Sequence, residues 1–213
     1  MKRWMYRAQV KKGGAVNFVS ALTASAGQWE RELREQGVNT VAVFAKEGSL
    51  FLYLEAVGEQ AVAWQWPAPC LVLLEEWPGA DGGHRHTVPM MPIYRDGEPP
   101  NARRTDAHER LGSLARLRPE MYSSYIFYHF ALQEEKPYGF NPTYAIGAHE
   151  ELIFSYHELP APVFEPGAAR HAWPESVLPS TNWHALMESH FQLWPGGDQG
   201  PVPWEKMNLI YCF

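Results

Sequence analysis

An internal duplication is the feature that most constrains the fold of this chain. Residues 40–55 (TVAVFAKEGSLFLYLE) reappear without a gap at 143–158 (TYAIGAHEELIFSYHE), with Thr, Ala, Ala, Glu, Phe, Tyr and Glu in register. A second echo relates 77–83 (WPGADGG) to 194–200 (WPGGDQG), and each copy is followed by a Met and then by Ile-Tyr. Because both echoes keep their order, the repeat unit is a whole domain of roughly 100 residues and not a small solenoid repeat.

Hydrophobic spacing predicts the elements of the first copy. In residues 15–36, Phe18, Leu22, Trp29 and Leu33 recur at helical spacing, and Gly37 follows as a stop signal. Two apolar runs on either side of residues 46–49 have the form of a hairpin. The expected order is a strand at 4–10, a helix at 15–36, hairpin strands at 38–45 and 50–57, a short helix, and a last strand at 88–94.

The same order is expected in the second copy. Its elements are a strand at 110–118, a helix from Pro119 to about residue 136, hairpin strands at 144–148 and 152–157, a helix at 182–193 and a closing strand at 206–212. A Pro-rich stretch at 159–179 is an insertion relative to the first copy, and residues 95–107 have the composition of a linker. We therefore predict an α+β fold: repeat 1 at 1–97, a linker at 98–108, and repeat 2 at 109–213. Both repeats are ferredoxin-like βαββαβ units that form an intramolecular dimeric α+β barrel.

Charge argues against a polyanionic partner. The chain of 213 residues carries a formal net charge of −6 and has a pI near 5.8. Binding nucleic acid through its phosphates requires clustered Lys and Arg. Arginines do gather between residues 103 and 118, but acidic residues are interspersed with them, which is typical of a solvated surface. We expect no nucleic-acid partner.

The sequence also predicts where in the cell the protein is found. The basic start is followed by polar residues instead of an apolar run, and no stretch approaches the length of a membrane span. Cys70 and Cys212 both lie in apolar contexts, which indicates buried thiols in a reducing compartment. The expectation is a cytoplasmic protein with no membrane partner.

Four segments of the second copy resemble the L-rhamnose mutarotase family. They are 110–129 (RLGSLARLRPEMYSSYIFYH), with a strand, an Arg-Pro-Glu junction and a helix bearing Tyr-x-x-x-His, then 152–158 (LIFSYHE), 183–187 (WHALM) and 209–213 (LIYCF). They stand in the family's order and span most of the second half. The resemblance implies a dimeric α+β barrel that interconverts the α and β anomers of L-rhamnose or a related aldose.

The resemblance also implies a catalytic pair, Tyr125 and His129. Anomerisation needs one proton delivered to the ring oxygen and one removed from the anomeric hydroxyl, which a His that titrates near neutrality serves in both directions. Tyr125, four residues earlier, shares the helical face and can donate a hydrogen bond to a sugar hydroxyl. No metal or organic cofactor is required. From spacing alone, both residues also fit satisfied positions in a protein core.

Candidate substrate-binding residues surround this pair in the prediction: Trp183, Tyr156, Glu158, Met187 and Trp173. Aromatic rings among them can stack on the C–H face of a neutral sugar. Glu158 lies two residues after Tyr156 and therefore shares its sheet face, as Glu55 does with Tyr53 in the first copy. That repetition favours a structural role for Glu158 as the alternative to substrate binding.

Aligning the halves from Arg3 with Arg110 sets Phe18 opposite Tyr125 and Leu22 opposite His129. The first repeat therefore keeps the apolar helix face, has lost both polar groups, and is interpreted as a structural, degenerate copy. The partner expected is a small sugar, bound by a monomer with an internal pseudo-dimer, with a homodimer left open.

Two other functions fit the same fold: a non-catalytic sugar or small-molecule binder, and an oxygenase or haem-handling protein. A metal site is weakly supported, because His84 and His86 lie in a Gly-rich turn without further ligands nearby in the sequence.

Overall fold

The structure, a computed structural model, describes residues 1–58, 62–79, 82–97, 104–135, 141–162, 176–179, 182–196 and 200–213. The chain forms two compact units. Unit 1 comprises Met1–Met90, Pro99–Thr105 and Met207–Phe213, and unit 2 comprises Met91–Glu98 and Asp106–Lys206. The two repeats of the sequence therefore do not coincide with the two units, because the end of each repeat belongs to the other repeat's unit.

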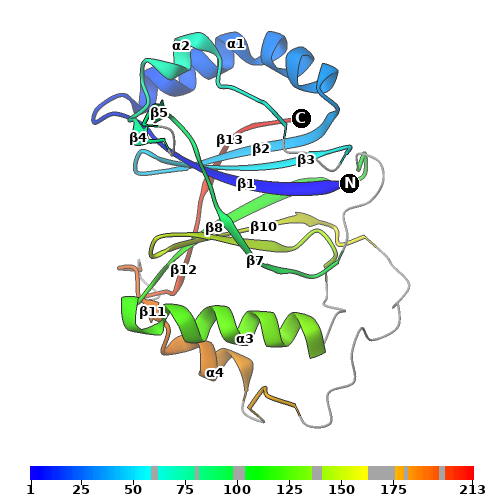
Figure 1. The fold of residues 1–213 in the computed structure, drawn as a ribbon, viewed down its shortest axis with the longest axis vertical. Coiled ribbons are helices and arrows are strands. Elements are labelled where there is room, and N and C mark those ends of the chain that lie inside the picture. Colours follow the sequence, from blue (N-terminus) through cyan, green and yellow to red (C-terminus); the bar gives the residue numbers. More distant parts are fainter. Residues whose placement is uncertain are drawn as a thin grey trace. The chain divides into compact units, whose positions relative to one another are not determined.

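Unit 1 is an antiparallel sheet covered on one face by a long helix (Figure 1). The sheet has the strand order β13-β2-β3-β1-β6. Its elements are β1 (Lys2–Gln9), α1 (Ala15–Glu35), β2 (Val38–Lys46), β3 (Ser49–Ala56), α2 (Ala68–Leu71), β6 (Val88–Pro89) and β13 (Asn208–Cys212), with a small separate ladder of β4 (Trp77–Pro78) and β5 (His84–Arg85).

Helix α1 forms where the hydrophobic spacing predicts it. Its buried residues are the four expected from that spacing: Phe18, Leu22, Trp29 and Leu33. They pack on the side chains that alternate residues of β2 and β3 direct toward the helix. The helix ends before Gly37, whose φ of +80° lies in the left-handed region that glycine adopts at little cost.

The hairpin between β2 and β3 is set by its turn. Glu47 and Gly48 have φ values of 49° and 86°, and Lys46 pairs with Ser49 across the two-residue loop. Positive φ at both central positions is the geometry that follows the right-handed twist of the flanking strands. This turn fixes the register that places Leu50, Leu52 and Leu54 toward the helix.

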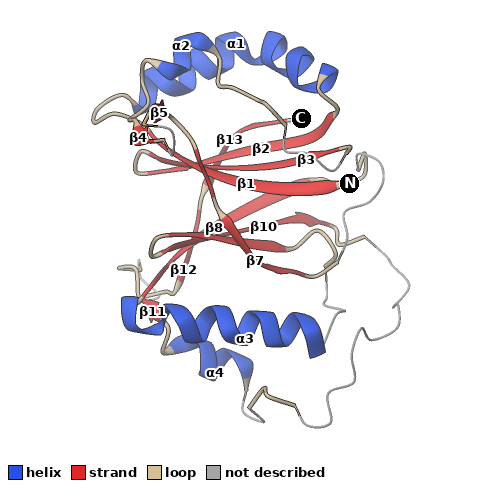
Figure 2. Cartoon of the chain, in the orientation of Figure 1, coloured by secondary structure: helices blue, strands red, loops and turns tan. Residues whose placement is uncertain are grey.

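Unit 2 repeats this plan (Figure 2). The strand order is β11-β8-β10-β9-β7, with β12 also paired to β8, and α3 and α4 lie on one face of the sheet. Its elements are β7 (Met91–Arg95), β8 (Glu109–Leu117), a 3₁₀ turn (Pro119–Met121), α3 (Tyr122–Glu135), β9 (Ala145–His149), β10 (Leu152–Leu159), α4 (Trp183–Glu188), β11 (Phe191–Gln192) and β12 (Trp204–Lys206).

The closing strands differ from the prediction. Each was expected as one strand of its own repeat, and each is divided in two. The first parts, β6 and β12, pair with β1 and β8 of their own repeats, whereas the second parts, β7 and β13, pair with β9 and β2 of the other repeats. Both second parts carry an irregularity at the same place, Pro92/Tyr94 in β7 and Leu209/Tyr211 in β13. Local pattern identifies a strand, but its partner is decided by tertiary context.

Two smaller expectations are also corrected. The predicted helix at 182–193 ends at Glu188, because the chain turns back there to pair β11 with β8. Cys70 is buried as expected, but Cys212 is exposed, since it alternates along β13 with Tyr211 and Phe213. The described part of the 159–179 insertion is limited to its two ends. The α+β class with ferredoxin-like units is confirmed, and the association of the two sheets as a barrel stays a prediction.

Candidate active site

Unit 2 contains a cavity of about 690 Å³ lined by side chains from the sheet and both helices. Its polar and aromatic lining residues include Tyr94 from β7 and Asp96 just after it, Tyr125 and His129 from α3, Tyr144 before β9, and Trp183 from α4, which also contributes Met187. Aliphatic and aromatic side chains form much of the remaining wall, among them Leu132, Ile146 and Phe191. Such a volume, largely apolar with a few converging polar groups, is typical of a small-molecule site.

Tyr125 and His129 lie one helical turn apart on α3, with their ring centroids separated by 4.0 Å. Both are almost fully buried. The Nδ1 atom of His129 is 2.9 Å from the backbone carbonyl oxygen of Tyr125. Since a carbonyl oxygen only accepts, we assign the proton of the neutral ring to Nδ1, which leaves the Nε2 lone pair available to a ligand.

Burial determines the protonation of this pair. Desolvation lowers the pKa of His129 to about 4, the charge on His190 adds to the lowering, and the hydrogen bond to the Tyr125 carbonyl opposes it. Burial raises the pKa of Tyr125 well above its usual range. At neutral pH the site therefore offers a neutral imidazole as proton acceptor beside a protonated phenol. The expectation that His129 titrates near neutrality is wrong for the folded protein, because burial disfavours the charged ring. Within the described part of the chain, the Tyr125 hydroxyl has no hydrogen-bond partner.

Tyr94, Asp96 and Tyr144 are cavity residues that the sequence did not single out. The hydroxyl of Tyr94 donates to Oδ1 of Asp96. Burial and the Asp96 carboxylate raise the pKa of Tyr94 far above its usual range. Burial also raises the pKa of Tyr144 to about 12; a hydrogen bond with Ser155 opposes that rise and Asp96 adds to it. All three phenols of the cavity therefore stay protonated at neutral pH.

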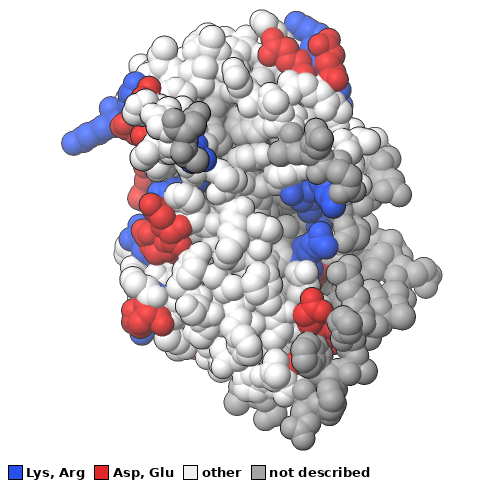
Figure 3. Space-filling model, in the orientation of Figure 1, with Lys and Arg blue, Asp and Glu red and all other residues white. Residues whose placement is uncertain are grey.

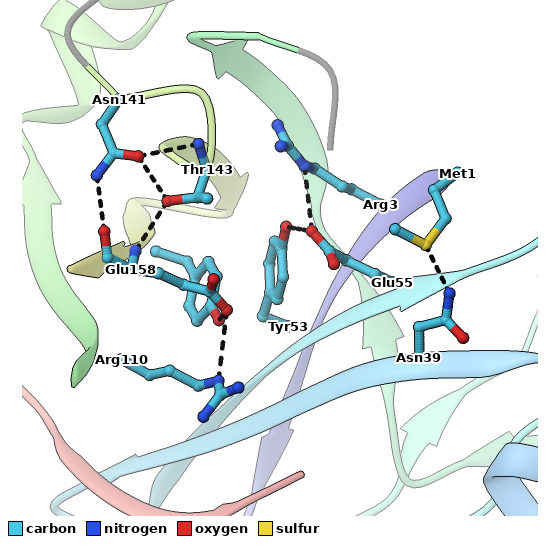
Figure 4. Close-up of polar contacts among 10 residues, drawn as sticks. Met1, Arg3, Asn39, Tyr53, Glu55, Arg110, Asn141, Thr143 and Glu158 are labelled. Carbon is cyan, nitrogen blue, oxygen red and sulfur yellow. Dashed lines mark hydrogen bonds and ion pairs between the residues drawn. The ribbon is translucent and has the colours of Figure 1, made fainter. Parts of the chain in front are cut away.

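Asp96 is held in place by the loop before β9. Its Oδ2 accepts a hydrogen bond of 2.9 Å from the backbone N–H of Asn141, and its own N–H donates to the carbonyl oxygen of Tyr144. The Asn141 side chain in turn accepts from the N–H and hydroxyl of Thr143 and donates to the Glu158 carbonyl oxygen (Figure 4). Because Asp96 is buried together with Asn141, Thr143 and Glu158, the carboxylate has little freedom to move.

Helix α4 brings Trp183 and Met187 to the same cavity. Asn182 caps this helix, with its side-chain oxygen accepting from the N–H of His184 at 2.9 Å. The Trp183 ring meets the His129 ring edge to face, with centroids 5.1 Å apart. His184 and Glu188 line the cavity from exposed positions. Four residues of the sequence prediction, Tyr125, His129, Trp183 and Met187, are thus brought together.

The structure does not bring Tyr156 and Glu158 into this cavity. They alternate along β10 with Ser155 and His157 and therefore lie on the sheet face opposite the helices. There the Tyr156 hydroxyl donates to Glu158 Oε1 at 2.7 Å, and Arg110 Nε lies 3.4 Å from the same oxygen. Trp173, the remaining predicted binding residue, lies outside the described residues.

Unit 1 contains the same arrangement on its own sheet. Tyr53 donates to Glu55 Oε1 at 2.5 Å, and Arg3 Nε lies 3.6 Å from that oxygen (Figure 4). In each unit the Arg and the Glu are directly opposed on neighbouring strands. A network that persists in the copy without the polar helix pair supports the structural alternative for Glu158.

The backbone shows which positions of the two units are equivalent. Asp96 donates its N–H to the carbonyl of Tyr144, and Phe213 donates its N–H to the carbonyl of Val41. Tyr144 and Val41 are themselves matched by the 40–55 repeat. Phe213 of unit 1 thus stands where unit 2 has Asp96. Continuing the comparison of repeats two residues past the Ile-Tyr echo would have found this replacement.

In unit 1 the equivalent positions are part of a packed core. Phe18, Leu22 and Phe213 are buried there together with Trp29 and Trp66, whose rings stack at 5.4 Å. Apolar residues thus replace Tyr125, His129 and Asp96. The interpretation of repeat 1 as a copy without the polar site agrees with this packing.

Metal ligands, surface charge and helix composition add three observations. Among the described residues, no three His, Cys, Asp or Glu side chains converge as ligands for a metal ion. On the face drawn in Figure 3, the described Lys and Arg side chains occur in small groups, several mixed with Asp and Glu.

No helix in the described ranges combines the length and apolarity needed to cross a membrane.

Comparison with known proteins gives one distant likeness. Neither a family model nor a curated protein sequence matches this chain. A solved structure from Fusobacterium nucleatum subsp. nucleatum, described as a "putative monooxygenase", is similar with a TM-score of 0.39 and 10% sequence identity. The match covers 99% of this chain and 92% of that one. A likeness this distant transfers no activity.

Proposed function

We propose that unit 2 is an aldose mutarotase that interconverts the α and β anomers of L-rhamnose or a related sugar. One observation carries the proposal. Tyr125, His129, Trp183 and Met187, which come from separate segments resembling the mutarotase family, line a single cavity. The L-rhamnose mutarotase resemblance was drawn from sequence alone, so the convergence of these four side chains is independent support.

The chemistry assigns one role to each member of the helical pair. His129 Nε2 accepts the proton of the anomeric hydroxyl while the bond between the anomeric carbon and the ring oxygen breaks. The ring oxygen takes its proton from the Tyr125 hydroxyl, and an open-chain aldehyde results. Rotation about the adjacent carbon–carbon bond and the reverse transfers close the ring as the other anomer. The 4.0 Å approach of the two rings places the transient imidazolium and phenolate next to each other, which stabilises both.

The apolar wall suits a deoxy sugar. Leu132, Ile146 and Met187 offer aliphatic surface for a methyl group such as that of L-rhamnose, and the Trp183 ring can cover a C–H face. Apolar contact of this kind displaces water from the part of the sugar that it covers, which strengthens the hydrogen bonds made there.

The test is NMR magnetisation exchange between the anomers of L-rhamnose and then of a small aldose panel. We expect the wild-type protein to accelerate exchange, and His129→Gln and Tyr125→Phe each to lower the acceleration by about 10²- to 10⁴-fold. His84→Gln, at an exposed position in unit 1, is the matched control and should leave the rate unchanged. Folded wild-type protein that accelerates exchange of none of these sugars overturns the proposal. If the sugars still bind, the non-catalytic binder is the function that remains.

An oxygenase acting on a quinol or similar phenol is the second candidate. The observation that favours it is the aromatic wall, in which Tyr94, Tyr125, Tyr144 and Trp183 surround a neutral imidazole able to remove a phenolic proton. Oxygen consumption with a hydroquinone, lost in His129→Gln, would select this function over the mutarotase. The absence of oxygen consumption, together with accelerated anomer exchange, would reject it.

A further inference from the structure

We propose that Asp96, with Tyr94, is the specificity-determining element of the cavity: it binds adjacent hydroxyl groups of a neutral or cationic sugar and rejects anionic sugars such as uronic acids and sugar phosphates. This inference rests on the proposed function, because it takes the cavity of unit 2 to be a sugar site. It goes further by naming the charge class of the substrate and the residues that select it.

The hydrogen-bonding capacity of these side chains supports the proposal. Each Asp96 oxygen accepts one bond from the protein, from Tyr94 or from the Asn141 N–H, and a carboxylate has further lone pairs to offer. The single proton of the Tyr94 hydroxyl points to Asp96, so its oxygen can only accept from a ligand. His129 Nε2 is also an acceptor. A complementary ligand must therefore bring several O–H or N–H donors, as the neighbouring hydroxyls of a sugar do and a simple phenol does not.

The charge of the cavity also favours neutral and cationic ligands over anionic ones. Of its described lining residues none is Lys or Arg, while Asp96 and Glu188 are acidic. Asp96 is 1% exposed, so water screens its charge poorly. An anionic ligand would lose its hydration next to the negative charge of Asp96 and would gain no cationic partner. Both effects disfavour its binding.

The fold does not require a carboxylate at this position. In unit 1, Phe213 makes the equivalent backbone hydrogen bond with an apolar side chain that is buried in the core. Burying a charge costs free energy, and a carboxylate at this position is not needed to pair β7 with β9. Three hydrogen bonds nevertheless hold Asp96 at the cavity wall, which is the preorganisation expected of a group that selects a ligand.

The experiment compares three sugars that differ in charge: L-rhamnose (neutral), D-galacturonate (anionic) and D-galactosamine (cationic), with D-galactose as the neutral hexose reference for the last two. Dissociation constants come from NMR titration of wild-type protein, Asp96→Asn, Tyr94→Phe and Glu120→Gln. For the wild type we expect D-galactose to bind at least tenfold more tightly than D-galacturonate, and D-galactosamine to bind at least as tightly as D-galactose.

The variants separate charge from hydrogen bonding. Asp96→Asn should weaken binding of neutral sugars by about tenfold or more and shrink the preference for galactose over galacturonate to within about threefold. Tyr94→Phe keeps the charge, so it should weaken neutral sugars while the discrimination against galacturonate persists. Glu120→Gln, at an exposed position of unit 2 outside the cavity lining, is the control that should change neither quantity by more than about twofold.

Equal affinity of the wild type for galactose and galacturonate overturns the inference, and this measurement needs no variant to fold. An unchanged preference in folded Asp96→Asn also overturns it. Charge-selective binding without accelerated anomer exchange would retain the inference and reject the mutarotase. Accelerated exchange without charge selection would do the opposite, and failure of every sugar to bind would reject both.

Discussion

The buried imidazole of His129 makes the stability of the protein depend on pH in a specific way. Its folded-state pKa is about 4, against an ordinary value of 6.5, because burial disfavours the charged ring. Above pH 6.5 the ring is neutral in both the folded and the unfolded chain, so it imposes no penalty. Below that pH His129 binds a proton in the unfolded chain but not in the folded protein, so the free energy of unfolding falls.

The size of the effect follows from the shift. Stability should fall by about 1.4 kcal/mol per pH unit below pH 6.5, reaching about 3 kcal/mol near pH 4, where the folded protein also begins to bind the proton. The control is His129→Gln, which keeps a polar side chain but does not titrate. The free energy of unfolding is measured for both proteins in urea, by tryptophan fluorescence, at pH 7, 6, 5 and 4.5.

The difference between the two proteins isolates His129, since other titrating groups contribute to both curves. We expect the wild type to lose about 2 to 3 kcal/mol relative to His129→Gln between pH 7 and pH 4.5. NMR of the imidazole gives a second reading, a titration midpoint near 4 with the proton on Nδ1 in the neutral form. Parallel stability curves, or a midpoint near 6.5, would refute the reasoning.

Three further substitutions test the packing and turns. Asn141→Ala removes the side chain that fixes the loop beneath Asp96, and it should lower the free energy of unfolding by about 3 kcal/mol; a loss below 1 kcal/mol in urea would contradict this. Gly48→Ala should cost about 1 to 2 kcal/mol, because φ is +86° and the added carbon would lie 3.0 Å from the Gln9 side chain; an unchanged melting temperature would count against it. Phe213→Asp places the unit 2 carboxylate in the packed core of unit 1 and should cost more than about 4 kcal/mol, so recovery of a fully folded protein would show that the site tolerates charge.

Local pattern was sufficient for the helices and hairpins. The helical spacing in residues 15–36 identified each buried residue of α1, because an amphipathic helix must turn its apolar face to the sheet. The same spacing, applied to the duplicated segment, placed Tyr125 and His129 on the inner face of α3. These are properties of neighbouring residues, which the sequence displays directly.

Pairing between distant segments, and the sheet face that the helices cover, could not be predicted from local sequence pattern. Alternation along β10 correctly set Tyr156 and Glu158 on one face, but it does not say which face the helices cover. Asp96 was assigned to a linker, since Asp-Gly followed by prolines is typical of one. Its role emerges only when β7 pairs with β9, and edge pairing between distant segments leaves no signature in a single sequence.

The exchange of closing strands has a consequence for how this protein can change. Tyr94 and Asp96 are encoded in the first repeat, yet they line a cavity whose helices are encoded in the second. Deleting the first copy would therefore remove an edge strand and an acidic wall from the second, and a gene for either half alone would specify an incomplete sheet. Each sheet thus depends on a strand from the other repeat, and the first repeat, whose own equivalent positions are apolar, supplies Tyr94 and Asp96 to the cavity of unit 2.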